Sequence, residues 1–350
     1  MIPRSRIEEI ARSLGFAAVG AAAAVPGDEG SRLERFVAEG RHGTMGSLAR
    51  DPARRSDPGA VVPGARSVVM AAAACPIPDD PGPAPLHGRV ARYACHDDYH
   101  DVLLGPLREL AAALGDPDAR AYVDTGPVME KVWARRAGLG WIGRNTLLIT
   151  RARGVWQLLG AIVTRAEVEP SPPHPDHCGT CTRCVDACPT GALTLAHEGP
   201  TGEGGRPTGA VLDARRCRAY LSIERRGPLT EQEEHDLGDA LFGCDLCLEA
   251  CPFNRFADGP AFPGLVQRLP VRVDLPPLLG LEGAAFRSRF AGTPVVRARR
   301  RGLLRNTSVI LGNLGDPDAI PHLERCAAQE EDEVVRESAA RALRRLGAGV

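Results

Sequence analysis

The sequence predicts an α+β protein of several domains, in which a mixed helix–strand domain is followed by a small cysteine-rich module and an α-helical tail. Three observations lead to this fold class. Helical stripes alternate with short apolar strands over residues 1–170, eight cysteines with regular spacing lie in residues 171–260, and repeat-like helical stretches fill residues 261–350. At 350 residues the chain is long enough for two or three domains with proper cores.

The first domain, residues 1–170, shows helical and strand patterns in turn. The predicted helices lie around residues 7–14, 33–37 and 99–114, the strands at 67–71 and 121–123, and a β-hairpin at 146–150 and 155–164. Pro106 should kink or restart the third helix, because proline has no backbone N–H to donate. Such alternation predicts an α/β-type domain.

The cysteine-rich module, residues 171–260, opens with a linker rich in proline and histidine. Its first cysteine run reads C-x-x-C-x-x-C-x-x-x-C-P from Cys178 to Pro189. The second run reads C-x-x-C-x-x-x-C-P from Cys244 to Pro252, and Cys217 lies between the two. The first run has the spacing of bacterial ferredoxins, in which three thiolates hold one iron–sulfur cluster and the fourth reaches the other cluster.

This spacing rule divides the eight cysteines between two 4Fe–4S clusters. The second run is one cysteine short of the ferredoxin pattern, and Cys217 supplies the missing ligand. The predicted ligands are Cys178, Cys181, Cys184 and Cys251 for the first cluster and Cys188, Cys217, Cys244 and Cys247 for the second. Cys75, Cys95 and Cys326 are left over, so we expect cluster assembly not to need them.

Zinc and disulfide bonds explain the same cysteines poorly. A zinc site takes four cysteines, commonly as two C-x-x-C pairs, and needs no ligand that crosses between runs. Disulfide frameworks are typical of small secreted chains, whereas this chain has 350 residues and an N-terminus without an apolar signal core. No apolar run approaches the ~20 residues of a membrane span. We therefore expect a cytoplasmic protein without membrane contact.

The segment Gly138-Leu-Gly-Trp-Ile-Gly143 matches the G-x-G-x-x-G pattern of dinucleotide-binding loops. That fingerprint needs a strand before it and a helix after it, whereas a helical stretch over 128–137 precedes this segment and an apolar strand follows it. The sequence therefore disfavours a dinucleotide. We expect the glycines to let the backbone approach another bulky ligand.

Two polar residues of the first domain are candidates for chemistry. Asp124 begins Asp-Thr-Gly-Pro at a strand end, which predicts a helix cap or Asx-turn, although a carboxylate there can also act as a general acid. Asp98-Tyr-His100 resembles part of the D-x-H-x-x-G signature of cobalt-binding histidines in some cobalamin proteins. Leu103 stands at the glycine position, so the default expectation for His100 is a packed or hydrogen-bonded side chain.

The tail, residues 261–350, combines helical stretches with arginines. Residues 314–323 carry the turn and helix start typical of HEAT-like units, between predicted helices at 305–314 and 334–346. The arginines of a dense basic run are Arg297, Arg299, Arg300, Arg301 and Arg305. Such runs bind phosphate backbones or simply face solvent, and the net charge of −1 gives no global sign of nucleic-acid binding.

Taken in order, these segments resemble the epoxyqueuosine reductase family over essentially the whole chain. The matching stretches are Asp-Thr-Gly-Pro-Val-Met-Glu-Lys at 124–131, Ala-Gly-Leu-Gly-Trp-Ile-Gly-Arg-Asn-Thr at 137–146, and residues 177–192, 212–224 and 242–254. Generic ferredoxins carry neither the 124–131 block nor the tail, so the joint match is specific. The stretch 198–209 is longer than the family pattern, and Cys95 and His96 stand in a variable segment.

The resemblance implies a cobalamin enzyme that reduces epoxyqueuosine at the tRNA wobble position to queuosine, the last step of queuosine synthesis. It implies the same division of cluster cysteines and a base-off cobalamin in residues 1–170. Candidate cobalamin contacts are Tyr93, His100, Trp141, Arg144 and Asn145. Asp124 takes the family's proton-donor position, which reverses the local expectation of turn chemistry. The arginine-rich tail would hold the anticodon stem by its phosphates.

Two other functions fit parts of the pattern. A cobalamin-dependent reductase of small molecules, such as a dehalogenase, would need no basic tail. An electron-carrying ferredoxin module with a docking domain would bind no corrinoid. For the enzyme that the resemblance implies, we expect an external electron donor of flavodoxin or ferredoxin type and a monomeric chain.

Overall fold

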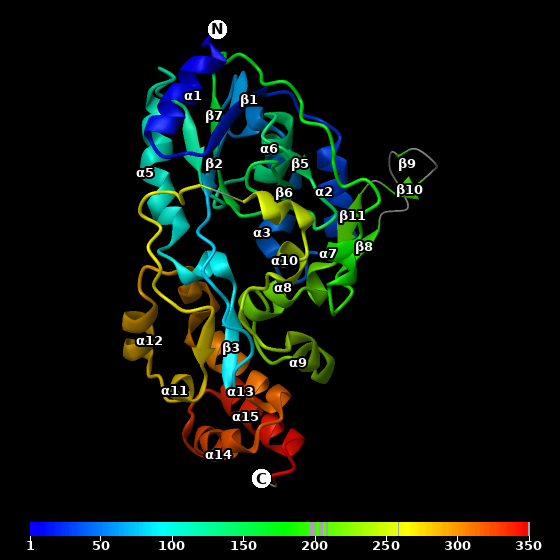
Figure 1. Cartoon of the computed structure of the whole chain (residues 1–350), viewed down its shortest axis with the longest axis vertical. Helices are drawn as coiled ribbons and strands as arrows, with labels where there is room; N and C mark the ends of the chain where they lie inside the picture. Colours follow the sequence, from blue (N-terminus) through cyan, green and yellow to red (C-terminus); the bar gives the residue numbers. More distant parts are fainter. Residues whose placement is uncertain (196–200, 203–205, 208, 258, 349–350) are drawn as a thin grey trace. The chain divides into compact units, whose positions relative to one another are not determined.

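The computed structural model describes residues 1–195, 201–202, 206–207, 209–257 and 259–348 (Figure 1). The chain forms two compact units that alternate along the sequence. Unit 1 is Met1–Pro76, Tyr99–Asp213 and Leu246–Leu265, and unit 2 is Ile77–Asp98, Ala214–Asp245 and Val266–Val350. The borders expected at residues 170 and 260 both fall inside unit 1. The division into three functional domains therefore stays a prediction, and the compact units do not follow it.

Unit 1 holds the mixed part of the fold. Its helices are α1 (Arg4–Ser13), α2 (Glu29–Ala38), α3 (Gly46–Ala49), α4 (Pro52–Ser56), α5 (Tyr99–Ala112), α6 (Glu130–Arg136), α7 (Arg183–Asp186) and α10 (Leu246–Glu249). Its strands are β1 (Ala18–Ala23), β2 (Ser67–Ala74), β4 (Arg120–Tyr122), β5 (Trp141–Ile142), β6 (Leu148–Ile149), β7 (Gln157–Thr164), β8 (Leu193–Leu195), β9 (Thr201–Gly202), β10 (Arg206–Pro207) and β11 (Ala210–Leu212).

A sheet in the order β1–β2–β7–β4 forms the centre of unit 1, and β2 is buried along its whole length. Because successive side chains of a strand point to opposite faces, β2 serves two cores. Val69 and Ala71 pack with α1 and α5, whereas Val68 and Met70 pack with Trp133 of α6. The sheet thus lies between two layers of helix, with α1 and α5 on one face and α6 on the other.

Two expectations for this domain need correction. Strands of α/β domains usually pair in parallel, but β1–β2, β2–β7 and β7–β4 are all antiparallel, because the order of helices and strands does not itself fix strand direction. The hairpin predicted from 146–150 and 155–164 is also wrong. The chain reverses between Thr150 and Gly154, so that β6 pairs with β5 while β7 enters the central sheet.

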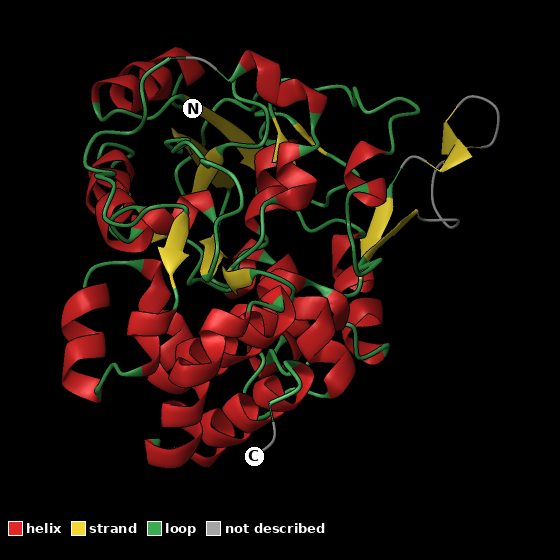
Figure 2. Cartoon of the chain, turned by 60° about the horizontal axis from the view of Figure 1, so that its bottom comes forward, coloured by secondary structure: helices red, strands yellow, loops and turns green. Residues whose placement is uncertain are grey.

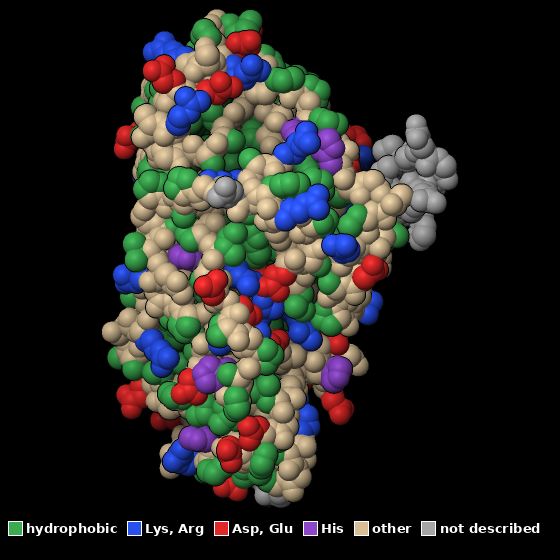
Figure 3. All heavy atoms as spheres, in the orientation of Figure 1, with side chains coloured by type: hydrophobic (Ala, Val, Ile, Leu, Met, Phe, Trp, Pro, Cys, Tyr) green, Lys and Arg blue, Asp and Glu red, His purple; other side chains and the backbone are tan. Residues whose placement is uncertain are grey.

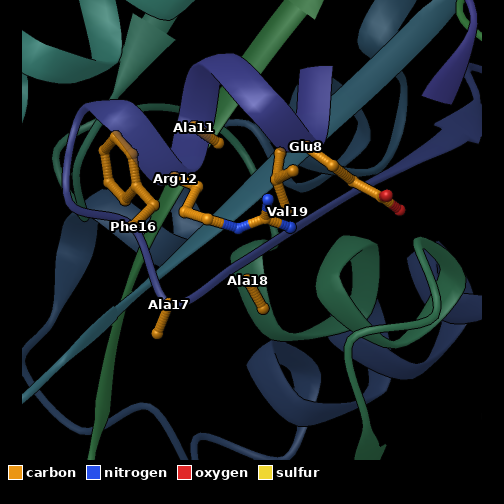
Figure 4. A pocket seen from close by; sticks show the side chains of 7 residues that line it. All are labelled: Glu8, Ala11, Arg12, Phe16, Ala17, Ala18 and Val19. Carbon is orange, nitrogen blue, oxygen red and sulfur yellow. The ribbon is translucent and has the colours of Figure 1, made fainter. Parts of the chain in front are cut away.

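The cysteine-rich segments add small elements to unit 1. Helices α7 and α10 contact each other, and β8 pairs with β11 in antiparallel fashion. The unusually long stretch 198–209 lies largely outside the described residues. A hollow of about 210 Å³ lies between α1 and the start of β1, where Arg12 reaches toward Val19 and Glu8 extends away (Figure 4). None of the candidate site residues lines it.

Unit 2 is richer in helix. Its strands are β3 (His87–Val90), β12 (Ala240–Phe242) and β13 (Arg272–Asp274), in the sheet order β12–β3–β13. Its helices are α8 (Arg218–Ile223), α9 (Glu231–Leu237), α11 (Pro276–Leu279), α12 (Gly283–Phe290), α13 (Arg299–Leu314), α14 (Ile320–Gln329) and α15 (Glu333–Arg345). Figure 2, coloured by secondary structure, shows helices α13, α14 and α15 as part of a large helical region.

The predicted turn at residues 314–323 is confirmed. Helix α13 ends at Gly315 with φ of +71°, and the Asp316 carboxylate accepts a hydrogen bond from the Asp318 backbone before α14 begins. Helix α15 packs on both α13 and α14. The HEAT-like nature of this tail stays a prediction. Within the described ranges, no helix is long and apolar enough to cross a membrane.

Candidate active site and cluster-binding cysteines

The four cysteines predicted for the first cluster all belong to unit 1, and their thiols influence one another's charge. The charge of Cys184 is influenced by Cys178, Cys181 and Cys251, and that of Cys251 by Cys178 and Cys181. Burial raises the pKa of the Cys184 thiol to about 11, and the neighbouring thiols push in the same direction. Four such thiolates repel one another unless a positive metal core sits between them, so the donor set fits a 4Fe–4S cluster.

Local backbone geometry places these four sulfurs. The Cys181 backbone N–H donates to the Cys178 carbonyl, which makes a tight turn with φ of +52° at Gly179. Contact between α7 and α10 brings the second cysteine run next to the first. Pro252 then opens a short 3₁₀ helix directly after Cys251. The proline after the last cysteine therefore turns the chain away from the ligand.

The cysteines predicted for the second cluster are divided between the two units. Cys188 and Cys247 belong to unit 1, and Cys217 and Cys244 belong to unit 2. Burial opposes ionisation of Cys188, but hydrogen bonds from Thr190 and from the backbone at 190, 192 and 193 outweigh it and lower the pKa of this thiol. Cys188 is thus prepared to bind metal as a thiolate. The grouping of these four ligands stays a prediction.

The three cysteines left over are all buried. Cys95 lies within reach of the Val90, Ala91 and Pro270 carbonyls, and burial raises the pKa of its thiol to about 12. Burial likewise raises the pKa of Cys326 to about 11. Burial raises the pKa of the predicted ligand Cys184 in the same way, so the prediction that these three cysteines are dispensable rests on spacing.

Asp124 lies at a strained turn after β4. Its φ is +56°, and the Thr125 N–H donates to the Val123 carbonyl, which makes Asp124 the central residue of a three-residue γ-turn. The N-cap of α6 is Met129, so Asp124 does not cap that helix. The Tyr99 hydroxyl donates to Asp124 Oδ2 at 2.9 Å, and His100 Nε2 lies 3.6 Å from the same oxygen.

The electrostatics of Asp124 favour the ionised carboxylate. Loss of water around the group works to raise the pKa, but hydrogen bonds from His100 and Tyr99 and the charge of Lys131 outweigh it, so the pKa of Asp124 is lowered. Its side chain is nevertheless 66% exposed. The carboxylate is therefore held by neighbours on one side and open on the other.

A second carboxyl group beside Asp124 is one that the sequence reasoning missed. Burial, and then repulsion from Asp124, raise the pKa of Glu130 to about 7, while Lys131 and Arg55 act against the shift. The Oε1 atom of Glu130 is buried and has no hydrogen-bond partner in the described part of the chain. The available signal in the sequence was Glu130 itself, which lies six positions after Asp124 and just beyond the Asp-Thr-Gly-Pro turn.

The five candidate cobalamin contacts have different surroundings in the two units, and their joint role stays a prediction. His100 lies beside Asp124, as just described, and Tyr93 belongs to unit 2, where it packs against Phe242. Trp141 and Arg144 instead bind the cysteine loop: Trp141 Nε1 donates to Cys178 Sγ at 3.3 Å, and Arg144 donates to backbone carbonyls of that loop. These direct contacts with the first cluster site were not expected from the sequence.

Asn145 is the candidate contact with an unused donor. Its Oδ1 accepts from the Leu147 backbone at 3.1 Å, whereas its buried Nδ2 has no partner among the described residues. A buried donor without an acceptor is costly unless a ligand supplies one. This atom fits a bound group that carries amide oxygens, as the corrin side chains of cobalamin do.

The glycines of residues 138–143 serve the protein's own backbone. A Cβ atom at Gly140 would lie 2.1 Å from the Ile149 carbonyl oxygen, and one at Gly143 would lie 2.3 Å from Ile149 Cδ1. Gly138 has φ of +73°, and a Cβ there would lie 2.2 Å from the Pro172 carbonyl oxygen. These contacts explain the glycines without a ligand, and the expected bulky ligand stays a prediction. The glycines allow a tight β5–β6 hairpin that touches the linker to the cysteines.

The arginines proposed to hold phosphates have very different surroundings. Arg305 is 1% exposed and donates to the Leu221, Arg225 and Gly227 carbonyls, so its assignment to a basic surface is wrong. Three others are paired with acids: Arg297 with Asp98, Arg300 with Glu330 and Arg301 with Asp332. Arg299 is exposed. On the face seen in Figure 3, basic and acidic side chains are interspersed.

Two family models match parts of the chain. A model described as a 4Fe–4S double cluster binding domain matches residues 177–254, and one described as epoxyqueuosine reductase QueG, DUF1730, matches residues 55–125. The first range contains all eight predicted cysteine ligands. The protein is therefore an iron–sulfur protein with a double-cluster domain.

Curated relatives named epoxyqueuosine reductase match almost the full chain. The protein of Gloeobacter violaceus is 42% identical over 331 residues, which cover 91% of this chain and 98% of the relative. The protein of Xanthomonas campestris is 38% identical over 354 residues, which cover 98% of this chain and 96% of the relative.

Solved structures of epoxyqueuosine reductases share the fold. One, with an epoxyqueuosine-modified tRNA-Tyr stem loop, has a TM-score of 0.86 and 29% identity, and covers 98% of this chain and 90% of that chain. Another, from Bacillus subtilis, has a catalytic aspartate loop swung out of the active site, with a TM-score of 0.83, 27% identity and the same coverage. The mixed helix–strand fold predicted from the sequence is confirmed in these coarse terms.

Proposed function

The chain belongs to the epoxyqueuosine reductase family, and we propose that it reduces epoxyqueuosine in tRNA to queuosine with Asp124 as the proton donor. The reaction removes the epoxide oxygen as water and leaves an alkene. It consumes two electrons and two protons for each epoxide. The protein must therefore deliver single electrons from its clusters and protons from its side chains to one small site.

Asp124 is the residue placed to give a proton to the departing oxygen. Its carboxylate is open to a ligand on one side and bound by Tyr99 and His100 on the other. In the open site its pKa is lowered, so the acid form must arise when substrate covers the carboxylate. Covering a carboxylate removes its water and favours the protonated form. A protonated acid then spares the oxygen from leaving as an unstable alkoxide.

Glu130 supports this proton supply. With its pKa raised to about 7 by burial and by Asp124, it holds a proton for part of the time near neutral pH. It is the residue before Lys131, the only lysine in the chain, whose charge also acts on Asp124. We assign to Glu130 the storage of a proton next to the donor, and to Lys131 the electrostatic balance of the two carboxyl groups.

Cobalamin, when bound, would supply a cobalt centre that takes electrons from the clusters and carries them to the epoxide carbon. Asn145 Nδ2 is suited to bind an amide of the corrin ring, because it is buried and has no acceptor in the described part of the chain. His100 is suited to orient the carboxylate of Asp124 rather than to bind cobalt, since its Nε2 faces Asp124 Oδ2.

The substrate is the anticodon loop of a tRNA, and the modified base must leave its stack to reach the active site. In the tail, Arg299 and Arg301 are both exposed. Arg299 is assigned a phosphate contact, because Arg301 is paired with Asp332. Arg297, Arg300 and Arg301 can reach phosphate only by leaving their acidic partners. An electron donor of flavodoxin or ferredoxin type and a monomeric chain complete the proposal.

The observation that carries this function is the exposed Asp124 carboxylate, bound by Tyr99 and His100 in the same unit as the four cysteines predicted for the first cluster. The test is an anaerobic assay with reconstituted protein, chemical reductant and a stem loop carrying epoxyqueuosine. Nucleoside mass spectrometry should detect queuosine only when cobalamin is added. Turnover without cobalamin would contradict the cofactor assignment, and no turnover with it would contradict the reaction.

A further inference from the structure

The β5–β6 hairpin makes direct contact with the sulfur of one cluster ligand. Trp141 Nε1 lies 3.3 Å from Cys178 Sγ and donates to it, and the Arg144 backbone N–H donates to the same sulfur. Both donors come from one short segment, at the two ends of residues 141–144. Two hydrogen bonds to a ligand sulfur draw negative charge away from it, which a sulfur that faces only solvent or apolar groups does not experience.

The same hairpin also clamps the loop that carries this sulfur. The Arg144 guanidinium donates to the Gly179 carbonyl at 2.8 Å and to the Cys181 carbonyl at 2.7 Å. Its side chain is almost wholly buried, at 4% exposure, so its charge is poorly screened by water. The hairpin thus brings a positive charge and two N–H donors to the turn between the first two cysteines.

Aromatic packing fixes the direction of the Trp141 N–H. The indole is 2% exposed, stacks on His174 with ring centroids 5.3 Å apart, and meets the edges of His177 at 5.0 Å and Phe253 at 4.8 Å. Phe253 follows Cys251 by two positions, so the indole is held from both cysteine runs. A ring fixed in this way keeps its donor aimed at the sulfur without reorganisation.

We propose that the β5–β6 hairpin sets the reduction potential of the cluster held by Cys178, Cys181, Cys184 and Cys251, through Trp141 and Arg144 as positioning residues. Reduction adds an electron to the cluster and makes its sulfur ligands more negative. Hydrogen bonds and a nearby positive charge stabilise that form more than the oxidised form, and so shift the potential in the positive direction. The inference rests on the 4Fe–4S assignment and not on the proposed epoxide chemistry.

Trp141→Phe tests the indole contribution, because phenylalanine keeps an aromatic ring and loses the N–H. Trp133→Phe is the matched control: Trp133 is equally buried, at 2%, and packs in the α6 core. Redox titration of the reconstituted full chain, followed by EPR without substrate, should show one of two clusters shifted to a more negative potential in Trp141→Phe. The control should match the parent. An unshifted Trp141→Phe, or an equal shift in the control, would overturn the proposal.

A second measurement needs no substitution. Protein grown with ¹⁵N-indole tryptophan should show, after reduction, a weak nitrogen hyperfine coupling to one cluster in pulsed EPR. The ¹⁵N signal should be absent from protein grown with unlabelled tryptophan, in which ¹⁴N couples at a different frequency. Its absence from the labelled parent would overturn the proposal even if Trp141→Phe failed to assemble its clusters. Because neither experiment includes tRNA, both outcomes are independent of whether the protein reduces epoxyqueuosine.

Discussion

Two sites within unit 1 differ in how firmly the protein holds their working side chains. Cys178 accepts hydrogen bonds from Trp141 and from the Arg144 backbone, and the Arg144 side chain, 4% exposed, clamps its loop. Asp124 stands at a γ-turn with φ of +56°, and its carboxylate is 66% exposed beside Tyr99. One site is built around its ligand sulfurs, and the other is open.

In the proposed mechanism, this difference matches the work assigned to each site. An electron-transfer site works best when little moves between its oxidised and reduced forms, which favours buried donors in fixed positions. A proton donor for a large substrate must stay accessible until that substrate arrives. The strained turn at Asp124 keeps the carboxylate projecting while Tyr99 and His100 orient it. In the proposed mechanism the substrate covers the exposed side of the Asp124 carboxylate, opposite Tyr99 and His100.

The largest expected effect concerns the open site. Asp124→Asn should fold and bind both clusters and cobalamin, but single-turnover reduction by excess prereduced enzyme should slow by ~10²–10⁴-fold, as for loss of other general acids. The amide can still accept from the Tyr99 hydroxyl but has no acidic proton to give. Asp101→Asn, at an exposed aspartate of α5, is the control and should turn over normally. A rate within a few-fold of the parent would make Asp124 structural.

The next effect concerns the held site. Cys251→Ser should lose one cluster, so that iron falls from about eight to about four atoms per chain, the content of a single 4Fe–4S centre. Cys326→Ser, at a buried cysteine of α14 outside the quartet, should keep the parental iron content. Iron and acid-labile sulfide analysis of anaerobically prepared protein makes the comparison. Full iron content in Cys251→Ser would show that another residue completes the first cluster.

Glu130 provides a test through pH and stability. Its folded-state pKa is raised to about 7 from the usual 4.5, so between these values the folded state binds the proton more tightly than the unfolded state. Stability should therefore fall as pH rises through this window, and Glu130→Gln should remove that loss. We expect a gain of about 1–3 kcal/mol at pH 8 and almost none below pH 4.5. A melting temperature that rose equally at both pH values would exclude this cause.

The smallest effect is expected at the tail, where Arg299 is exposed and Arg305 is buried. Arg299→Ala should reduce the slope of log affinity against log salt for the tRNA stem loop by about one phosphate contact. Arg301→Ala, at a side chain paired with Asp332, should change the slope less. Filter binding at several salt concentrations gives both slopes. Equal slopes in the parent and Arg299→Ala would place Arg299 away from the phosphates.

The sequence predicts best those features that depend on spacing along the chain. The partition that joins Cys251 to the first run follows from spacing alone and stays a prediction; in the structure Cys178, Cys181 and Cys251 influence the charge of Cys184. Contacts between distant segments are harder to predict. Trp141 and Arg144 look like ligand-binding residues in the sequence, because nothing near them reveals that the cysteine turn packs against them. In the sequence Arg305 reads as one more member of the basic run. In the structure, helix α13 directs its side chain into the protein, where it donates to the Arg225 and Leu221 carbonyls.

Local strand signals fail for a similar reason. Residues 146–150 and 155–164 are two apolar runs separated by Gly154, which is a normal hairpin pattern. The pairing is decided by competition for partners. Strand β7 pairs along its whole length with β2 and also with the short strand β4, and β6 pairs with β5. Glu130 was missed because its raised pKa comes from burial, and the sequence does not show that the carboxyl group of the first residue of helix α6 is buried.

The alternation of the two units along the chain bears on how the protein is made. At ~5–20 residues per second, the ribosome releases Cys251 several seconds after Cys178, Cys181 and Cys184. During this interval the first cluster has three of its four ligands, and the last segment of unit 1 is still missing. Iron delivered during synthesis would meet an incomplete site. Cluster insertion should therefore follow translation of residue 265, and a ribosome-bound chain that ends before Cys251 should not retain the first cluster.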